Sequence, residues 1–231
     1  MFKQEKNKNS DKPKALEVIR DRVPDLIKEL PRWICWRYEY SNNKWTKPPI
    51  SPFNGKTANI NDKNVWADFV EASAAHQSSN IRSDGIGFVL SKDDDIVGID
   101  IDHCFKDGKI TKAAQSIIKK FNSYTEFSPS GEGFRIFCKG HVPFGGRKNP
   151  KLGLEIYSCG RYLTVTGHLH DEQFTDIIEN KAALDWLLDQ HFSDTTNARV
   201  ALNIASQRIN QSLIREFLVK LCNSVHVYKF K

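Results

Sequence analysis

The chain has 231 residues, of which 39% are hydrophobic, and it carries a formal net charge of +6 at neutral pH. No apolar run reaches the length of a membrane span, no hydrophobic leader opens the chain, and the five cysteines form no CxxC pair. Membrane proteins and secreted disulfide frameworks are therefore excluded, and a cytoplasmic protein with no membrane partner is expected. The basic balance allows a polyanionic partner without identifying one.

The first third of the chain predicts a short helical region, a strand and a loop. Residues 15–30 favour a helix that Pro24 breaks or restarts. Residues 32–40, RWICWRYEY, favour a strand because they are rich in aromatic side chains. A loop dense in turn residues follows at 41–59.

An amphipathic helix is expected at 65–79, with Asn61 or Asp62 as its cap. Residues 84–102 contain two apolar strands around a polar turn, which is a hairpin signal. A helix is expected at 112–123.

Three further elements complete the pattern. Residues 124–140 favour strand, glycine-rich turn and strand, and residues 152–169 favour another strand pair with Gly160 near its turn. Residues 176–192 favour a helix. Strands mixed with helices and several hairpins predict an α+β fold with a mostly antiparallel sheet.

Composition divides the chain into three parts. Residues 1–14 are rich in Lys and Asn and are predicted to be a disordered basic N-terminus. Residues 15–192 are predicted to form the main domain, and residues 193–231 a helical tail. Four apolar residues recur there every four positions, as on one helix face: Ile209, Leu213, Phe217 and Leu221.

The apolar strand IVGIDI carries a charged residue where a core residue is expected. Asp100 and the following Asp102 share one face because side chains alternate along a strand. Two like charges on one face repel, and burying them is costly unless a cation compensates. Hard oxygen ligands at this spacing suit Mg²⁺ or Mn²⁺. The alternative is an exposed face with two solvated aspartates.

Glu155 repeats this anomaly, since it is a lone acid in the apolar strand LEIY. A third carboxylate would complete a site for two metal ions, as nucleotidyl transfer commonly uses. A solvent-facing Glu on an edge strand is the alternative interpretation.

The stretch SPSGEGFR, residues 128–135, suits an anion. Its glycines let backbone amides approach a phosphate closely, its serines can donate hydrogen bonds, and its arginine offers a planar fork. The candidate nucleotide-binding residues are Ser128, Ser130, Gly131, Gly133 and Arg135. An ordinary hairpin turn with an exposed Arg remains possible on this pattern alone.

Two more cations are candidate phosphate contacts. Arg161 follows Gly160 in SCGRYLTVTG, and Lys47 lies in a rigid Pro-rich loop. Each is equally compatible with a solvated turn residue.

The spacing of some Cys and His residues raises the alternative of a structural zinc site. Cys138 and His141 stand in a C-x-x-H spacing, and His103 and Cys104 are adjacent. Inert packing is the favoured interpretation of these thiols.

Together these motifs resemble the archaeo-eukaryotic primase superfamily, specifically the primase-polymerase domains of phage and plasmid replication proteins. The resemblance rests on Asp-x-Asp in a strand, then SPSGEGFRIF, then LEIY followed by GRYLTVTG, and it spans about residues 30–170. It implies a divided core whose palm is built on a sheet like that of RNA-recognition domains.

The resemblance also implies roles for particular residues. Asp100 and Asp102 match the first family motif and Glu155 matches the acid of the third, so these would bind the catalytic metals. The second motif usually ends in a His that contacts the incoming triphosphate, and here Arg135 stands at that position. Guanidinium binds phosphate at least as well as imidazole does.

The sequence therefore predicts a template-directed nucleotidyltransferase, a DNA primase/polymerase using two Mg²⁺ or Mn²⁺ ions. Its expected partners are nucleoside triphosphates and a single-stranded or primed DNA template, with any replicative helicase on a separate chain because no GxxxxGK[ST] motif occurs. The alternatives are a weakly active or inactive primase-like module that binds nucleotide or single strands, and a metal-dependent nuclease.

Overall fold

The computed structural model describes residues 11–192 and shows two large antiparallel sheets, two further sheets of two strands each, and few helices. The α+β prediction is confirmed at this level. The predicted tail at 193–231 and most of the predicted disordered N-terminus lie outside the described residues, so the predicted domain boundaries stay predictions. Of residues 11–14, Lys12 is paired with Asp84 at 2.8 Å.

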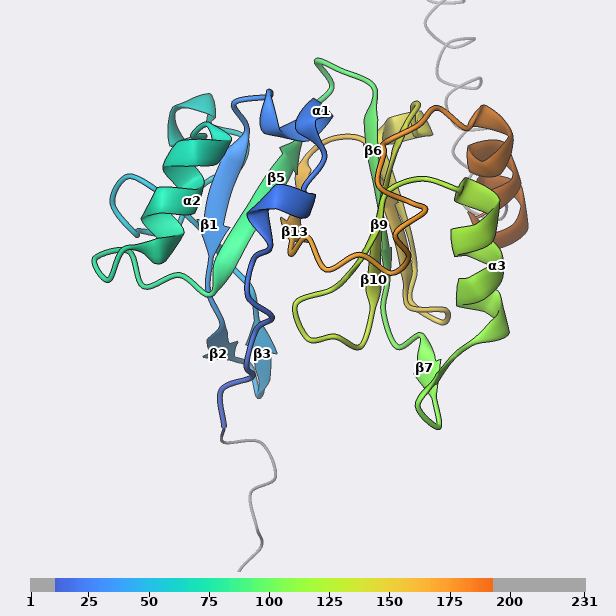
Figure 1. Cartoon of the computed structure of the whole chain (residues 1–231), viewed down its shortest axis with the longest axis horizontal. Helices are drawn as coiled ribbons and strands as arrows, with labels where there is room; N and C mark the ends of the chain where they lie inside the picture. The colour runs from blue at the N-terminus through green and yellow to red at the C-terminus, as the bar shows by residue number, and fades with distance from the viewer. Residues whose placement is uncertain (1–10, 193–231) are drawn as a thin grey trace, which may run out of the picture. The chain divides into compact units, whose positions relative to one another are not determined.

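The first sheet has four strands in the order β13-β5-β1-β4. The helix α2 packs against it beside β1 and β5 (Figure 1). The bounds are β1 (Trp33–Trp36), β4 (Pro49–Ile50), β5 (Gly85–Leu90), β13 (Arg161–Val165) and α2 (Phe69–Gln77).

The second sheet has five strands in the order β11-β12-β6-β10-β9, and α3 lies beside it (Figure 1). The apolar stripe of α3 has helical spacing, as the sequence predicts, and is buried. The bounds are β6 (Ile96–Ile101), β9 (Thr125–Phe127), β10 (Phe134–Lys139), β11 (Gly146–Asn149), β12 (Leu154–Tyr157) and α3 (Lys112–Phe121).

Smaller elements connect these layers. Residues 181–192 are helical, and no helix in the described part of the chain is both long and apolar enough to cross a bilayer. The short elements are η1 (Arg20–Arg22), α1 (Asp25–Lys28), β2 (Glu39–Ser41), β3 (Lys44–Thr46), η2 (Lys63–Val65), β7 (Phe105–Lys106), β8 (Lys109–Ile110) and η3 (Pro143–Gly145).

Two of the three predicted strand pairs are wrong as hairpins. The strands β5 and β6 belong to different sheets, and so do β12 and β13. Both strands of the first pair are buried along their whole length, so each needs neighbours on both faces and the polar turn between them crosses from one sheet to the other. The β9–β10 hairpin is confirmed, with Phe127 opposite Phe134.

The predicted helix at 15–30 is largely wrong. Only η1 and the short α1 after Pro24 are helical. The chain before them is tied to distant segments instead, because Leu16 N–H donates to the Pro129 carbonyl and Ile19 N–H to the Thr166 carbonyl. Tertiary hydrogen bonds therefore outweigh local propensity.

The predicted helix at 65–79 begins later than expected. Asp68 caps α2 in a capping box with Glu71, whereas Asp62 caps η2 by accepting from Asn64 N–H. The turn before α2 therefore has its own cap.

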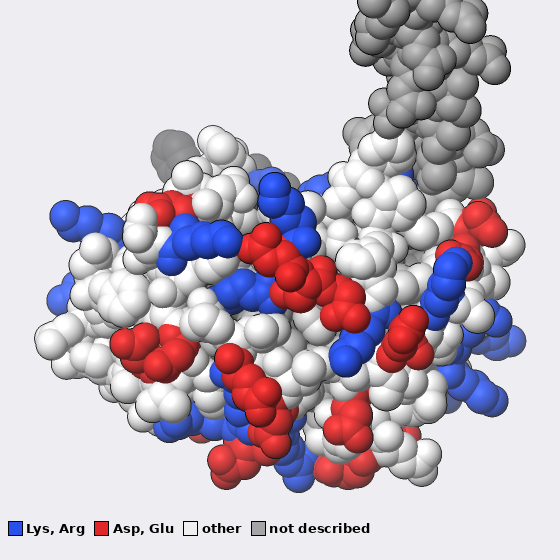
Figure 2. All heavy atoms as spheres, turned by 90° about the horizontal axis from the view of Figure 1, so that it is seen from above, with Lys and Arg blue, Asp and Glu red and all other residues white. Residues whose placement is uncertain are grey.

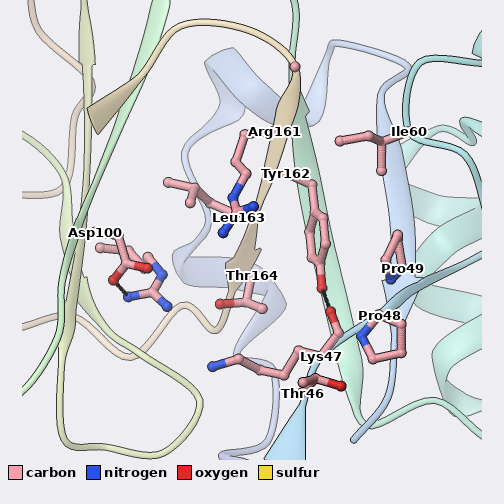
Figure 3. A pocket seen from close by; sticks show the side chains of 12 residues that line it. Thr46, Lys47, Pro48, Pro49, Ile60, Asp100, Arg161, Tyr162, Leu163 and Thr164 are labelled. Carbon is pink, nitrogen blue, oxygen red and sulfur yellow. Dashed lines mark hydrogen bonds and ion pairs between the residues drawn. The ribbon is translucent and has the colours of Figure 1, made fainter. Parts of the chain in front are cut away.

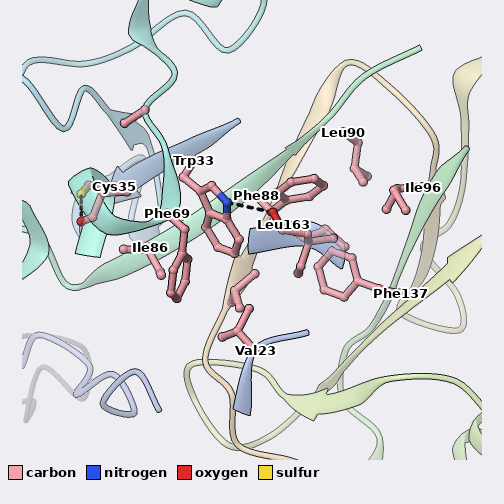
Figure 4. Packing of buried hydrophobic residues seen from close by; sticks show 14 of the residues in the cluster. Val23, Trp33, Cys35, Phe69, Ile86, Phe88, Leu90, Ile96, Phe137 and Leu163 are labelled. Carbon is pink, nitrogen blue, oxygen red and sulfur yellow. Dashed lines mark hydrogen bonds between the residues drawn. The ribbon is translucent and has the colours of Figure 1, made fainter. Parts of the chain in front are cut away.

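The core lies between the two sheets (Figure 4). Phe137 and Ile96 of the second sheet are in one buried cluster with Phe88 and Leu163 of the first. Gly98 lets the sheets approach here, because a Cβ on it would lie 2.4 Å from Leu163 Cδ1. This contact sets the spacing of the strands that carry the candidate site.

We expect Gly98→Ala to destabilise the fold by about 1–3 kcal/mol, because the added methyl overpacks a buried contact. Urea unfolding of the variant would measure the loss. The double variant Gly98→Ala with Leu163→Ala should be destabilised by less than the sum of the two single variants, since the methyl then enters vacated space. Additive losses would contradict this account of the contact.

Candidate active site

Five charged residues form one row across the second sheet. Residues directly opposite each other on neighbouring antiparallel strands project from the same face. The strand register therefore places one charged side chain of each strand side by side on that face. In spatial order the row is Lys148, Glu155, Asp100, Arg135 and Glu126.

At the centre of the row, Asp100 is ion-paired with Arg135. Both residues are buried, with relative exposures of 9% and 3%. Burial raises the pKa of Asp100 to about 6, although the Arg135 guanidinium opposes that shift. Asp102 is half exposed and lies 3.9 Å from Arg135. Arg135 thus supplies the positive charge beside the buried Asp100 carboxylate. The sequence pattern predicts a metal ion in that role.

Glu155 lies beside Asp100 on the same face, as predicted. Its carboxylate is held by Lys148 at 3.0 Å, by the Tyr157 hydroxyl at 2.6 Å and by Arg161 at 3.4 Å. Burial raises the pKa of Glu155, but these contacts outweigh it and leave the pKa below its usual range.

Asp100 and Glu155 are therefore directly opposite each other on adjacent strands, but Asp100, Asp102 and Glu155 do not converge on one point. Among residues 11–192, no three His, Cys, Asp or Glu side chains are grouped closely enough to hold a metal ion. The assignment of Asp100, Asp102 and Glu155 as metal ligands stays a prediction. The donor chemistry fits Mg²⁺ or Mn²⁺, since the first two supply carboxylate oxygens on one side of a strand.

A cavity of about 430 Å³ opens beside this row, between the two sheets (Figure 3). Asp100 and Arg135 line it from the second sheet, and Arg161 lines it from β13. Lys47 enters from the loop before β4, where its carbonyl accepts a hydrogen bond from the Tyr162 hydroxyl. Four predicted residues from separate segments thus meet at one cavity.

The cavity has an excess of positive charge. Lys47, Arg135 and Arg161 face a single lining carboxylate, that of Asp100. Burial lowers the pKa of Lys47, and the nearby Arg135 lowers it further. A bound anion would relieve this repulsion, so the electrostatics favour an anionic ligand.

Residues 128–133 of the glycine-rich turn do not line this cavity, but Gly133 lies against the end of β6. A Cβ on Gly133 would lie 2.7 Å from the Ile101 carbonyl and 3.4 Å from Asp102 Oδ1. Ser128 Oγ accepts from Gly133 N–H, and Ser130 Oγ accepts from Glu132 N–H. Gly131 has a φ of 75°, a conformation that favours glycine. These serines hold the turn, and their predicted role toward a triphosphate stays a prediction.

Sequence reasoning missed Glu126, the last member of the row. It is fully buried, and its carboxylate accepts hydrogen bonds from the Tyr124 hydroxyl and from the amides of Thr166 and Gly167. Burial outweighs these donors and raises its pKa to about 7. The sequence holds only a weak signal for it, since Glu126 lies between Thr125 and Phe127 in a short strand directly before the glycine-rich turn.

Cys104 and Cys138, the two thiols with spacing suited to zinc, are buried as packing residues are. Cys138 is buried, which raises its pKa to about 12, and burial raises the pKa of Cys104 to about 11. Neither thiol belongs to a group of three or more potential metal ligands among residues 11–192.

The chain is 35% identical over 197 residues to a protein of Nitratiruptor phage NrS-1 named DNA primase-polymerase. The predicted relationship to phage primase-polymerases is thereby confirmed. The alignment covers 81% of this chain and 26% of the phage protein, so the chain spans about a quarter of that relative's length. No family model matches the chain.

We expect Arg135→Ala to cost about 3–5 kcal/mol of unfolding free energy at pH 8, because it leaves the Asp100 carboxylate buried without its partner. Arg161→Ala is the matched control, since its guanidinium is 46% exposed in the contact with Glu155 and should cost about 1 kcal/mol at most. Adding Asp100→Asn to Arg135→Ala should recover part of the loss. Equal unfolding midpoints for the two arginine variants would refute the central role of this pair.

Glu126 predicts a pH dependence of stability. Its pKa is raised in the folded state, so the folded protein holds the proton more tightly than the unfolded chain does. The unfolding free energy should therefore fall as pH rises from about 4.5 to about 7, by up to about 3 kcal/mol from this residue. Glu126→Gln should remove that component in urea titrations at several pH values, whereas the exposed Glu132→Gln should keep it. An unchanged slope in Glu126→Gln would contradict the assignment.

Proposed function

We propose that this chain is a metal-dependent nucleotidyltransferase domain that builds DNA on a template, as a primase, a polymerase or both. The convergence of Lys47, Asp100, Arg135 and Arg161 on one cavity carries the proposal. The relationship to a protein named DNA primase-polymerase supports it independently.

The nucleoside triphosphate is proposed to bind in the cavity between the sheets. Its volume of about 430 Å³ is in the range of small-molecule sites. Lys47 and Arg161 reach the cavity from the first-sheet side and Arg135 from the second, so phosphate oxygens would be held from both sides.

The metal ions are proposed to be held by Asp100 and Asp102, with Glu155 in the neighbouring position of the row. Bound Mg²⁺ or Mn²⁺ would supply Lewis-acid stabilisation of the charge that develops during phosphoryl transfer. A cation held by Asp100 would take the place of Arg135 as partner of that carboxylate, and the Arg135 guanidinium would then be available to phosphate. Lys148 and Tyr157 hold Glu155 in its ionised form beside the row.

The template is proposed to be single-stranded or primed DNA. On the face seen in Figure 2, basic and acidic side chains are interspersed rather than separated. A narrow contact near the cavity is therefore favoured over a broad basic surface on that face. A helicase on a separate chain stays a prediction.

A primase-like module with weak or no activity is the second candidate. Two observations favour it: Asp100 is already neutralised by Arg135, and the three acids do not converge. Such a module would bind nucleotide or single strands through the same cavity without incorporation.

Incorporation of labelled nucleotides into primed and unprimed templates, in Mg²⁺ and in Mn²⁺, separates these candidates. We expect Asp100→Asn and Asp102→Asn each to reduce incorporation by about 100-fold or more, because carboxylate ligands of the metals are lost. Asp107→Asn, in the turn between β7 and β8, is the control and should keep wild-type activity. Nucleotide binding without incorporation by the wild type would favour the inactive module, and loss of the template strand would favour a nuclease.

A further inference from the structure

A second cavity adjoins the proposed nucleotide pocket. It has a volume of about 270 Å³, and it shares Ile60 and Gly160 with the first cavity. Ile60 lies at the end of the first cavity away from Lys47 (Figure 3). The two cavities are therefore neighbours, and the second lies at the end of the first that is opposite Lys47.

The floor of the second cavity is apolar and contains a fixed aromatic ring. Trp66 is half-buried, and its Nε1 donates a hydrogen bond of 2.9 Å to the Ile60 carbonyl. Ile60 contributes aliphatic surface beside it. A ring that is already held in place loses little conformational entropy when a flat ligand stacks on it.

The rim of the cavity carries exposed cations. Lys63 lies 5.8 Å from the centroid of the Trp66 ring and forms an exposed ion pair of 2.6 Å with Asp93. Lys92 is also exposed at this rim. A flat apolar floor with lysines around it matches a base together with its phosphate.

We propose that the second cavity is a subsite for one nucleotide of a DNA strand, with its base against Trp66 and its phosphate toward Lys63 and Lys92. The proposal rests on the proposed function in one respect: it takes the first cavity as the nucleotide pocket, next to which the DNA strand lies. The position next to that pocket favours a strand over a free nucleotide, because a neighbouring unit of one polymer must lie next to the reacting one.

The first test is the affinity of a short fluorescent single-stranded oligonucleotide, measured by anisotropy on the full chain. Trp66→Ala should weaken binding by about tenfold, the range expected for losing one stacked base. Trp66→Phe should keep most of the affinity because a stacking face remains. Affinity for a nucleoside triphosphate in Mg²⁺ should change less than twofold in both variants.

The lysines have a matched control. Lys63→Ala should reduce the salt dependence of oligonucleotide binding by about one phosphate contact. Lys181→Ala removes another exposed lysine with an aspartate partner, Asp185, that lines neither cavity, and should change nothing. Equal affinities and salt dependence for wild type, Trp66→Ala and Lys63→Ala would overturn the proposal.

A second measurement needs no variant. Cys159 lines the second cavity and is half-exposed, whereas the other free cysteines among the described residues, Cys35, Cys104 and Cys138, are buried. The oligonucleotide should slow alkylation of Cys159, followed by peptide mass spectrometry, by several-fold. Protection by free triphosphate but not by oligonucleotide would overturn the proposal, since the subsite would then bind a mononucleotide.

The outcome is separable from the proposed function. If wild type incorporates nucleotides but Trp66→Ala binds the oligonucleotide normally, only the subsite is wrong. If wild type incorporates nothing while strand binding depends on Trp66, the subsite stands and the polymerase assignment falls.

Discussion

The ion pair between Asp100 and Arg135 is the interaction on which the site depends. Asp100 lies two residues along β6 from Gly98. The residues opposite Gly98 on the adjacent strands, Phe137 and Tyr157, belong to the core between the sheets. A carboxylate so close to that core needs a cation, and the adjacent strand supplies it in register. Asp100 and Glu155 are adjacent in the row, and each has a basic residue opposite it on its other neighbouring strand. Arg135 is opposite Asp100, and Lys148 is opposite Glu155.

The path of the chain between the sheets explains why distant residues meet. After β12, which carries Glu155, the chain crosses to the first sheet and returns along β13, so Arg161 lies back over the row. Tyr162 on β13 then binds the carbonyl of Lys47 and fixes the Pro-rich loop. A cavity lined by charged side chains therefore lies between the two sheets, beside the core that they share.

Charge balance in this cavity links binding to chemistry. Without a ligand, Arg135 neutralises Asp100, while Lys47 stays partly desolvated beside two arginines. Phosphates at the basic groups would relieve the repulsion between them, whereas a cation at Asp100 would have to displace Arg135 from that carboxylate. The same balance distinguishes an active enzyme from a primase-like binding module, because only the former must release Asp100 from its arginine.

The sequence by itself determined the residue types and their alternation. Asp100 and Glu155 stood out as acids in apolar strands, because the alternation of side chains along a strand is local. The pairing of β12 with β6, which places the two acids side by side on one face, comes from the tertiary structure. Tertiary structure decided what local patterns do not contain. It placed β5 and β6 in different sheets, turned Arg135 toward Asp100, and buried Glu126 against Thr166 and Gly167. Strand partners and ion pairs between distant segments depend on long-range packing, and a hairpin signal reports only that two strands are joined by a turn.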